Sequence, residues 1–335
     1  MPNKTKDKLI RWYIDTRPLS TTPTPPTKTP PTLPLLTTLQ ATDQASVQKY
    51  YHLKDKQMSL ASNLLKYLFI HRTCRIPWQD ISISRTPAPH KRPCFVPSPA
   101  LVRSSGRDIP NIEFNVSHQA SFVALAGTVF LPSEVEPEAN ANANAETEAK
   151  KETEKVQVGI DITCVNERRN TPNTLPSLNE YVDIFGEVFS ANELNAMKSL
   201  CGISSPGKSE TELADYGFRL FYTFWALKEA YIKMTGEALL APWLKELVFT
   251  DVVAPGPAVG WGEPYTGVRT WLYGREVEDV RVEVVAFEDD YLVATAARGG
   301  GIGKVDGGED LWGPLEKVDI DDIRPCAMGE CRCLQ

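Results

Sequence analysis

The sequence predicts an α+β fold built from two similar α/β subdomains. The chain has 335 residues, 42 % of them hydrophobic, which is enough for one large core or two smaller ones. Residues 112–127 and 280–298 each have the pattern strand, turn, strand, and they end alike in FVALA and LVATA. Each follows a segment with helical spacing of apolar residues. Such a duplication favours a cleft between the two halves, which is a common position for ligands.

The first half contains a predicted helix from about Asp55 to Arg72. Its apolar residues recur at helical spacing: Leu60, Leu64, Leu65, Leu68 and Phe69. The half ends with the predicted hairpin at 112–127.

The second half begins with a β-rich segment at 156–165 and contains a predicted helix from about Asp215 to Met234. It ends with the predicted hairpin at 280–298, in which two adjacent aspartates suit a turn.

Two segments depart from the globular pattern. Residues 18–36 are rich in Thr and Pro, which sustain neither a helix nor a central strand. Residues 132–155 carry an Ala-Asn repeat and a Glu-rich stretch with no aromatic residue, so we expect a disordered insert. A Gly-rich stretch then follows the second half. The predicted domains are an N-terminal subdomain 1–131, the insert 132–155, a C-terminal subdomain 156–298, and a linker and tail 299–335 whose apolar residues could pack back.

Charge and hydropathy exclude several classes of protein. The net charge is −7, whereas a nucleic-acid surface needs an excess of Lys and Arg. The first 17 residues lack the apolar stretch of a signal peptide, and no apolar run approaches the ~20 residues of a membrane helix. We therefore expect a cytoplasmic protein without nucleic-acid or membrane partners.

The seven cysteines are expected to be reduced thiols, because disulfides are rare in the cytosol. Cys331-Arg332-Cys333 lacks the spacing of a zinc ribbon, and the four histidines form no HxxxH pair. On this local spacing we expect no structural zinc site.

The segment FYTFWALKEAYIKMTGEAL (221–239) is the most informative about function. At about 100° per residue, four apolar side chains share one helix face: Leu220, Phe224, Leu227 and Tyr231. Glu229 and Lys233 fall on the opposite face, and Gly236 suits the helix end. One interpretation is a surface ion pair contributing only ~0.3–0.5 kcal/mol. The other is a pocket in which the carboxylate holds a metal ion and the lysine a phosphate, which the neighbouring aromatic residues favour.

Two further motifs carry polar groups on predicted strands. VGIDIT (158–163) places Asp161 in an otherwise apolar strand. It could cap a turn, but a buried carboxylate is costly unless it is paired or bound to metal. FNVSHQ (114–119) holds Ser117 and His118, which could donate hydrogen bonds to phosphate. Adjacent strand residues point to opposite faces, so a Ser-His hydrolase dyad is not expected.

In this order, FNVSH, VGIDI and FWALKEAYIK resemble the motifs of the Sfp-type 4′-phosphopantetheinyl transferases, in the form found in filamentous fungi. The resemblance extends from about Tyr50 to Arg298. It implies a pseudo-twofold monomer with the active site in the cleft between the subdomains. The implied reaction transfers phosphopantetheine from coenzyme A to a serine hydroxyl of an apo acyl or peptidyl carrier protein, with adenosine 3′,5′-bisphosphate as the other product.

The resemblance also implies a Mg²⁺ site with Asp161 and Glu229 as ligands. Many bacterial members have a third acid where this chain has Thr163; a water could replace that ligand, or the metal could be held more loosely. Lys233 matches the lysine that contacts the transferring phosphate, and Lys228 matches another lysine of the block. The base that takes the serine proton is left open between Glu229 and a water on the metal.

Coenzyme A contacts are implied for Ser117 and His118, which match the family's pair at the phosphates. Arg92 takes the place of a basic residue in the family's G-K-P element. Lys54 and Arg85 are similar to basic residues that hold the 3′-phosphate in eukaryotic members, with solvated surface charge as the alternative. The competing function is a coenzyme A-binding or carrier-docking protein without turnover. Possible carriers belong to polyketide, nonribosomal-peptide or lysine biosynthesis.

Overall fold

A computed structural model describes most of the chain, and its contacts divide it into two compact units. The described residues are 8–20, 33–87, 90–106, 108–130, 156–166, 171–203, 207–237, 241–303 and 310–334. Unit 1 comprises residues 1–156, 300–302 and 307–335; unit 2 comprises residues 157–299 and 303–306. The predicted α+β class with two subdomains is confirmed. The Thr/Pro-rich segment lies largely, and the predicted insert wholly, outside the described residues.

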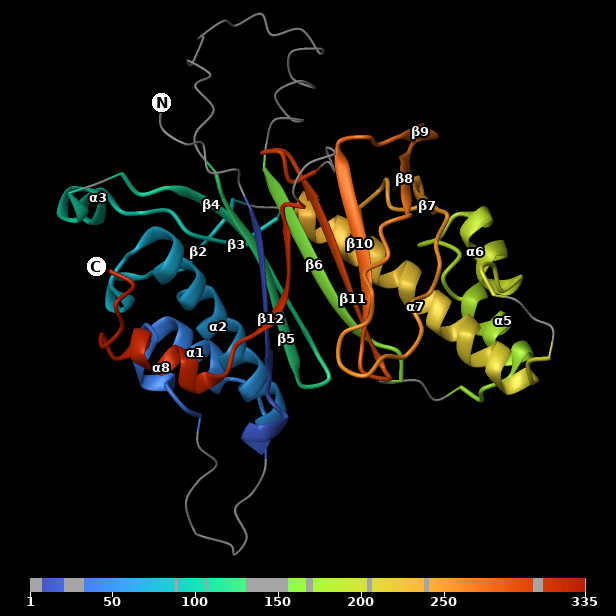
Figure 1. Ribbon diagram of the computed structural model, residues 1–335, viewed down its shortest axis with the longest axis horizontal. Coiled ribbons are helices and arrows are strands. Elements are labelled where there is room, and N and C mark those ends of the chain that lie inside the picture. Colours follow the sequence, from blue (N-terminus) through green and yellow to red (C-terminus); the bar gives the residue numbers. More distant parts are fainter. Residues whose placement is uncertain are drawn as a thin grey trace, which may run out of the picture. The chain divides into compact units, whose positions relative to one another are not determined.

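Unit 1 is a four-stranded sheet covered by a long helix. The strand order is β12-β1-β5-β4, and all pairs are antiparallel except β1 with β12. The strands are β1 Leu9–Asp15, β4 Asn111–Gln119, β5 Phe122–Phe130 and β12 Trp312–Lys317. The helices are α1 Ala41–Gln48, α2 Leu53–Cys74, α3 Pro99–Ser105 and α8 Ile320–Ala327, and a short hairpin pairs β2 Ser84–Arg85 with β3 Pro93–Cys94. Helix α2 packs on β4 and β5 through the predicted leucine face (Figure 1).

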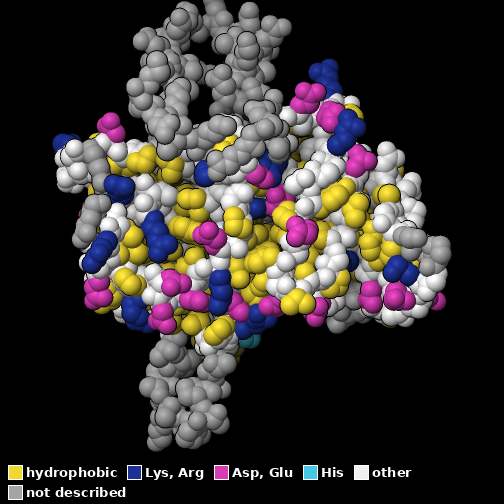
Figure 2. Space-filling view, in the orientation of Figure 1, with side chains coloured by type: hydrophobic (Ala, Val, Ile, Leu, Met, Phe, Trp, Pro, Cys, Tyr) yellow, Lys and Arg dark blue, Asp and Glu magenta, His cyan; other side chains and the backbone are white. Residues whose placement is uncertain are grey.

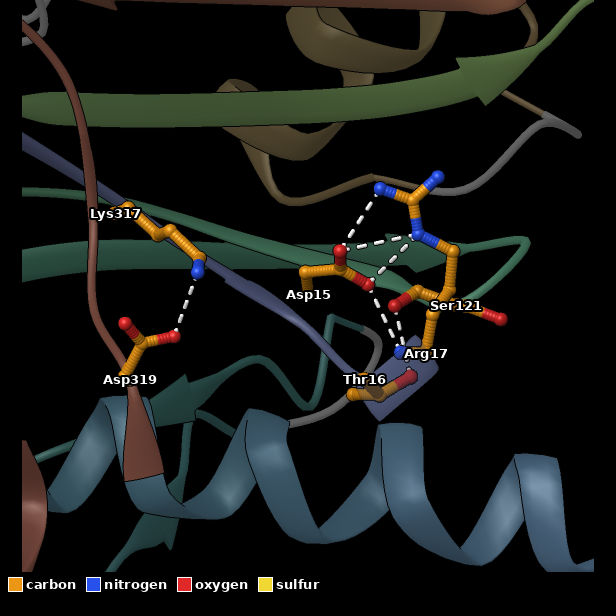
Figure 3. Close-up of polar contacts among 6 residues, drawn as sticks. All are labelled: Asp15, Thr16, Arg17, Ser121, Lys317 and Asp319. Carbon is orange, nitrogen blue, oxygen red and sulfur yellow. Dashed lines mark hydrogen bonds and ion pairs between the residues drawn. The ribbon is translucent and has the colours of Figure 1, made fainter. Parts of the chain in front are cut away.

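The turn of the β4–β5 hairpin is anchored to the end of β1 (Figure 3). Ala120 and Ser121 have φ of 48° and 81°, the left-handed conformation that two-residue hairpin turns require. The Ser121 carbonyl accepts hydrogen bonds from the Thr16 amide at 2.8 Å and from its hydroxyl at 2.7 Å. Beside it, Arg17 donates hydrogen bonds to the Asp15 carboxylate from both its backbone amide and its guanidinium group. These contacts fix the end of β4 that carries Ser117 and His118.

The C-terminal segment, expected to be a linker and a tail whose apolar residues could pack back, contributes a strand and a helix to unit 1. Strand β12 extends the sheet, with Trp312 opposite Leu9 and Leu315 opposite Arg11. Lys317 at its end pairs with Asp319 at 2.8 Å (Figure 3), and Asp319 is the N-cap of α8. Since β1 and β12 lie at opposite ends of the sequence, no local pattern could predict their pairing.

Unit 2 places one long helix against a three-stranded antiparallel sheet of order β10-β11-β6 (Figure 1). The strands are β6 Gln157–Cys164, β10 Val280–Phe287 and β11 Tyr291–Arg298, and the helix is α7 Glu210–Thr235. A second sheet contains β7 Leu247–Thr250, β8 Arg269–Leu272 and β9 Arg275–Glu276, and two shorter helices are α5 Leu175–Asp183 and α6 Ala191–Lys198. Helix α7 begins with a capping box at Ser209 and ends at Gly236, as predicted for that glycine.

Helix α7 and strand β6 approach each other closely at Gly159. A Cβ atom there would lie 2.0 Å from the Ala230 carbonyl oxygen and 2.4 Å from the Met234 amide nitrogen. Only glycine therefore allows this packing. Asp161 and Thr163 lie on the same side of β6 as Gly159, so they face the C-terminal half of α7.

Charged side chains of both signs are interspersed over the face drawn in Figure 2. This agrees with the modest net charge of −7. Among the described residues, no helix combines the length and apolar content needed to cross a membrane.

Candidate active site

The predicted acidic and basic residues of unit 2 come together where β6 faces α7. Asp161 lies on β6, and Glu229 and Lys233 lie one turn apart on α7. The Asp161 carboxylate is almost fully buried, and its Oδ1 is 2.5 Å from Lys233 Nζ. Lys233 therefore pairs with Asp161 across the helix–strand contact, whereas one interpretation of the sequence paired it with Glu229.

Thr163 has a definite role at the position where many resembling proteins carry a third acid. It lies two residues after Asp161 on β6 and shares the same strand face. Its hydroxyl donates a hydrogen bond to Asp161 Oδ2 at 2.6 Å. Both oxygens of Asp161 thus have a partner, which fixes the orientation of the carboxylate.

Glu229 is a half-buried carboxyl whose pKa is raised to about 7. Burial is the largest cause, and the charge of Asp161 adds to it, while Lys233 acts in the opposite direction. A carboxylate whose pKa is raised by a neighbouring carboxylate also favours a cation beside the two groups. Carboxylate oxygens are the ligands that Mg²⁺ prefers, so the residues present fit a divalent metal ion.

Lys228 has a different environment from the predicted contact with coenzyme A. Its side chain is 1 % exposed and pairs with the fully buried Glu193 at 3.1 Å. Its ammonium also donates to the carbonyl oxygens of Leu244, at 3.0 Å, and Leu247. An ammonium has three N–H groups, and these three acceptors use them. Lys228 is therefore a structural residue of the unit 2 core, which corrects its predicted place among the coenzyme A contacts.

A polar pocket of about 630 Å³ lies in unit 1, beside α2 and the β2–β3 hairpin. Arg85 and His118, both predicted from the sequence, line it together. Lys49 and Lys66 add two further basic groups, and Asp43 is the one acidic residue among those lining the pocket. An excess of positive charge in a concave, hydroxyl-rich surface suits a phosphorylated ligand.

Lys66 is a basic residue of this pocket that the sequence analysis did not identify. It lies among the apolar residues of α2, and burial lowers its pKa to about 8; Asp43 partly offsets this and Arg85 adds to it. A desolvated lysine beside an arginine gains from an anion that neutralises both. No local motif marks Lys66, because its neighbours in sequence pack into the core.

The remaining predicted residues of unit 1 do not line the pocket. Ser117 is buried while His118 is exposed, in line with their opposite strand faces. Arg92 forms an ion pair with Glu113 on the neighbouring strand β4. Lys54 is exposed near the start of α2. The structure therefore brings together only Arg85 and His118 of the five.

Comparisons with known protein families match both units. The family model described as "4′-phosphopantetheinyl transferase, N-terminal" matches residues 26–130. The model described as "4′-phosphopantetheinyl transferase superfamily" matches residues 157–296. These ranges contain every residue named above in the group on β6 and α7 and in the polar pocket of unit 1.

Individual relatives match over nearly the whole chain. The chain is 56 % identical to 4′-phosphopantetheinyl transferase A of Aspergillus fumigatus, over 99 % of this chain and 97 % of the relative. It is 56 % identical to 4′-phosphopantetheinyl transferase NpgA of Emericella nidulans, over 97 % and 96 %. It is 26 % identical to the L-aminoadipate-semialdehyde dehydrogenase-phosphopantetheinyl transferase of Homo sapiens, over 78 % and 67 %.

Proposed function

Since the chain belongs to the 4′-phosphopantetheinyl transferase superfamily, we propose that it transfers phosphopantetheine from coenzyme A to a serine of apo carrier proteins. The observation that carries this proposal is the group on β6 and α7: two facing carboxylates with a lysine on one of them. Such a group suits phosphoryl transfer, in which charge must be stabilised on phosphate oxygens.

The reaction forms a bond between the serine oxygen and the β-phosphorus of coenzyme A. The bond from that phosphorus to the bridging oxygen breaks, and adenosine 3′,5′-bisphosphate leaves with the electron pair. Glu229 is the carboxylate that we propose to take the serine proton. A divalent ion, which we propose to be Mg²⁺, would be held by Asp161 and Glu229 and would neutralise charge on the phosphates.

Lys233 has two tasks in this proposal. It orients Asp161 through the 2.5 Å ion pair, and its side chain, about a quarter exposed, can reach a bound phosphate. Thr163 holds the second oxygen of Asp161. Lys233 and Thr163 together keep the Asp161 carboxylate in one orientation while negative charge develops on the phosphate.

The pocket of unit 1 is proposed to bind the phosphates of coenzyme A. Arg85, His118 and Lys66 line it and supply positive charge or hydrogen-bond donors. Lys54, Arg92 and Ser117 lie outside its lining, so we propose auxiliary roles for them near the ligand. We further propose that the protein acts as a cytoplasmic monomer, on carriers of polyketide, nonribosomal-peptide and aminoadipate-pathway enzymes.

Mass spectrometry of apo carriers incubated with the protein, coenzyme A and Mg²⁺ tests this function. Each substrate carrier should gain one phosphopantetheine group, and a panel of the three carrier classes would define the specificity. Asp161→Asn is the matched control, which should leave the carriers unmodified. Coenzyme A binding without modification of any carrier would instead support the non-catalytic alternative.

A further inference from the structure

A second cluster of ligand atoms lies in unit 1, at the end of the described chain. His71 of α2, Cys326 of α8, and Cys331 and Cys333 beyond α8 place one ring nitrogen and three sulfur atoms within 4.8 Å of one another. None of these residues takes part in the proposed transfer. We propose that the four side chains bind one zinc ion, which fastens the C-terminal segment to α2.

The distances between the ligand atoms suit a tetrahedral zinc site. With Zn–S bonds of about 2.3 Å, two thiolates on one zinc ion lie about 3.8 Å apart. Cys326 Sγ and Cys333 Sγ are 3.8 Å apart, whereas a disulfide would need about 2.05 Å. His71 Nε2 and Cys331 Sγ are 3.1 Å apart. A tetrahedral site would separate these two atoms to about 3.6 Å, which is a small adjustment for a side chain beyond the last helix.

The orientation of His71 supports the same conclusion. Its Nδ1 lies 2.7 Å from the Ile76 carbonyl oxygen, and both groups are buried. A carbonyl oxygen only accepts hydrogen bonds, so Nδ1 carries the proton and Nε2 offers its lone pair to the three sulfurs. Histidines that bind zinc are oriented in this way by an acceptor on the other ring nitrogen.

The backbone after α8 brings the last two sulfurs back to the first. The chain reverses at Gly329, whose φ of 75° is left-handed. The amides of Glu330 and Cys331 then both donate to the Pro325 carbonyl oxygen, at 2.8 and 3.0 Å. This turn is held by backbone hydrogen bonds, so the ligand positions are set before any metal binds.

Charge and access are also suitable. Zinc with three thiolates and a neutral imidazole has a net charge of −1, and Arg72, next to His71 on α2, supplies a nearby positive charge. Cys331 and Cys333 are only half-buried, which leaves a path for the ion.

The expectation from local spacing was that no structural zinc site exists. The structure argues against it, because the four ligand atoms lie together. His71 and Cys331 are 260 residues apart in the sequence. A pattern search over neighbouring residues could not have joined them.

Metal analysis of the full chain, purified without a histidine tag, tests the proposal. We expect about one zinc ion per chain, and loss of this zinc in Cys331→Ser/Cys333→Ser. Cys201→Ser is the matched control, because Cys201 is an exposed cysteine of unit 2 and its variant should keep the zinc. Since Cys331 and Cys333 lie beyond the last helix, the double variant should stay folded with a lowered Tm.

Cobalt substitution supplies the second measurement. The Co²⁺ form of the wild type should show a thiolate-to-cobalt charge-transfer band that weakens with each cysteine replaced, and His71→Gln should shift its visible bands. Equal, substoichiometric zinc in the wild type and in the double variant would overturn the proposal. So would a Cys326–Cys333 disulfide in the protein as isolated, detected by mass spectrometry after alkylation.

Discussion

Two lysines of α7, five residues apart, lie in contrasting surroundings. Lys228 is surrounded by the core of unit 2, where its ammonium pairs with Glu193 and donates hydrogen bonds to two carbonyl oxygens. Lys233 is about a quarter exposed and is paired with Asp161. Each lysine neutralises one carboxylate, but only Lys233 keeps part of its ammonium open to a ligand.

This contrast shows that one helical motif can serve two purposes. In WALKEAYIK the first lysine joins α7 to α6 and β7, and the second joins α7 to β6 beside the proposed site. Burial decides between these roles, because a fully desolvated charge must be paired inside the protein. Substitutions around Lys233 should therefore affect transfer, and substitutions around Lys228 should affect stability.

The largest effect is expected at the carboxylates beside Lys233. Asp161→Asn and Glu229→Gln should each lower kcat/KM for transfer by at least about 10³-fold, because charge on the phosphates loses its stabilisation. Steady-state transfer to an apo carrier measures this, with circular dichroism as the control for folding. Near-normal transfer by either variant, or by the wild type in excess EDTA, would remove these residues from the site.

Lys228→Met should act on stability. It leaves the Glu193 carboxylate buried without its cation, which should lower the free energy of unfolding by about 3–5 kcal/mol. Urea denaturation measures the loss, and transfer per folded molecule should stay close to wild type. Lys228→Met/Glu193→Gln should recover part of the stability. An unchanged unfolding free energy would mean that this pair does not hold the core.

Lys233→Met should give the opposite pattern. Turnover should fall by on the order of 10²-fold, because a positive charge is lost beside the transferring phosphate. Stability should fall by less than in Lys228→Met, since Lys233 is partly solvated and the Asp161 carboxylate keeps its hydrogen bond from Thr163. Lys233→Arg should also be impaired, because a planar fork replaces a compact ammonium. A variant with normal turnover would return Lys233 to the role of a simple ion pair.

The smallest effect concerns Lys66 and pH. Its folded pKa of about 8 lies below the ordinary 10.5, so the unfolded chain binds more protons between these values. Stability should therefore rise as pH increases from about 8 toward 10.5. Binding of coenzyme A needs the charged form, so its KM should rise severalfold above pH 8 in the wild type.

The Lys66→Met variant isolates that dependence. It should have a raised KM for coenzyme A at neutral pH and should lose the increase above pH 8. Lys245→Met, at an exposed position of unit 2, should behave as wild type. A Lys66→Met enzyme with the wild-type pH profile would show that another group titrates.

The secondary structure of both units was largely predictable from local patterns. The apolar spacing on α2 and α7 and the two hairpins marked elements whose cores are set by neighbouring residues. The pairing of β12 with β1 was not predictable, because a parallel pair depends on contacts between distant segments. The Gly-rich stretch before β12 suggested a tail instead.

The candidate site was predictable where a motif placed a charged residue in an otherwise apolar segment. Asp161 lies in an apolar strand and Glu229 lies among aromatic residues, where a carboxylate is costly to bury. The structure places both residues where β6 faces α7. Lys228 was misjudged, because its partner Glu193 lies on another helix. Lys66 was missed because its neighbours in the sequence of α2 are apolar, and they gave no sign of the polar pocket.

The parallel pairing of β1 with β12 affects the order in which the two units can complete their folding. Strand β1 is synthesised before unit 2, whereas its outer neighbour β12 is synthesised after it. Unit 2 is almost contiguous in sequence, so it can complete its core while the sheet of unit 1 is still missing a strand. During that interval β1 has an unpaired edge, which in a nascent chain is a site for mispairing. The sheet of unit 1 is therefore completed only after the residues of unit 2 have been synthesised.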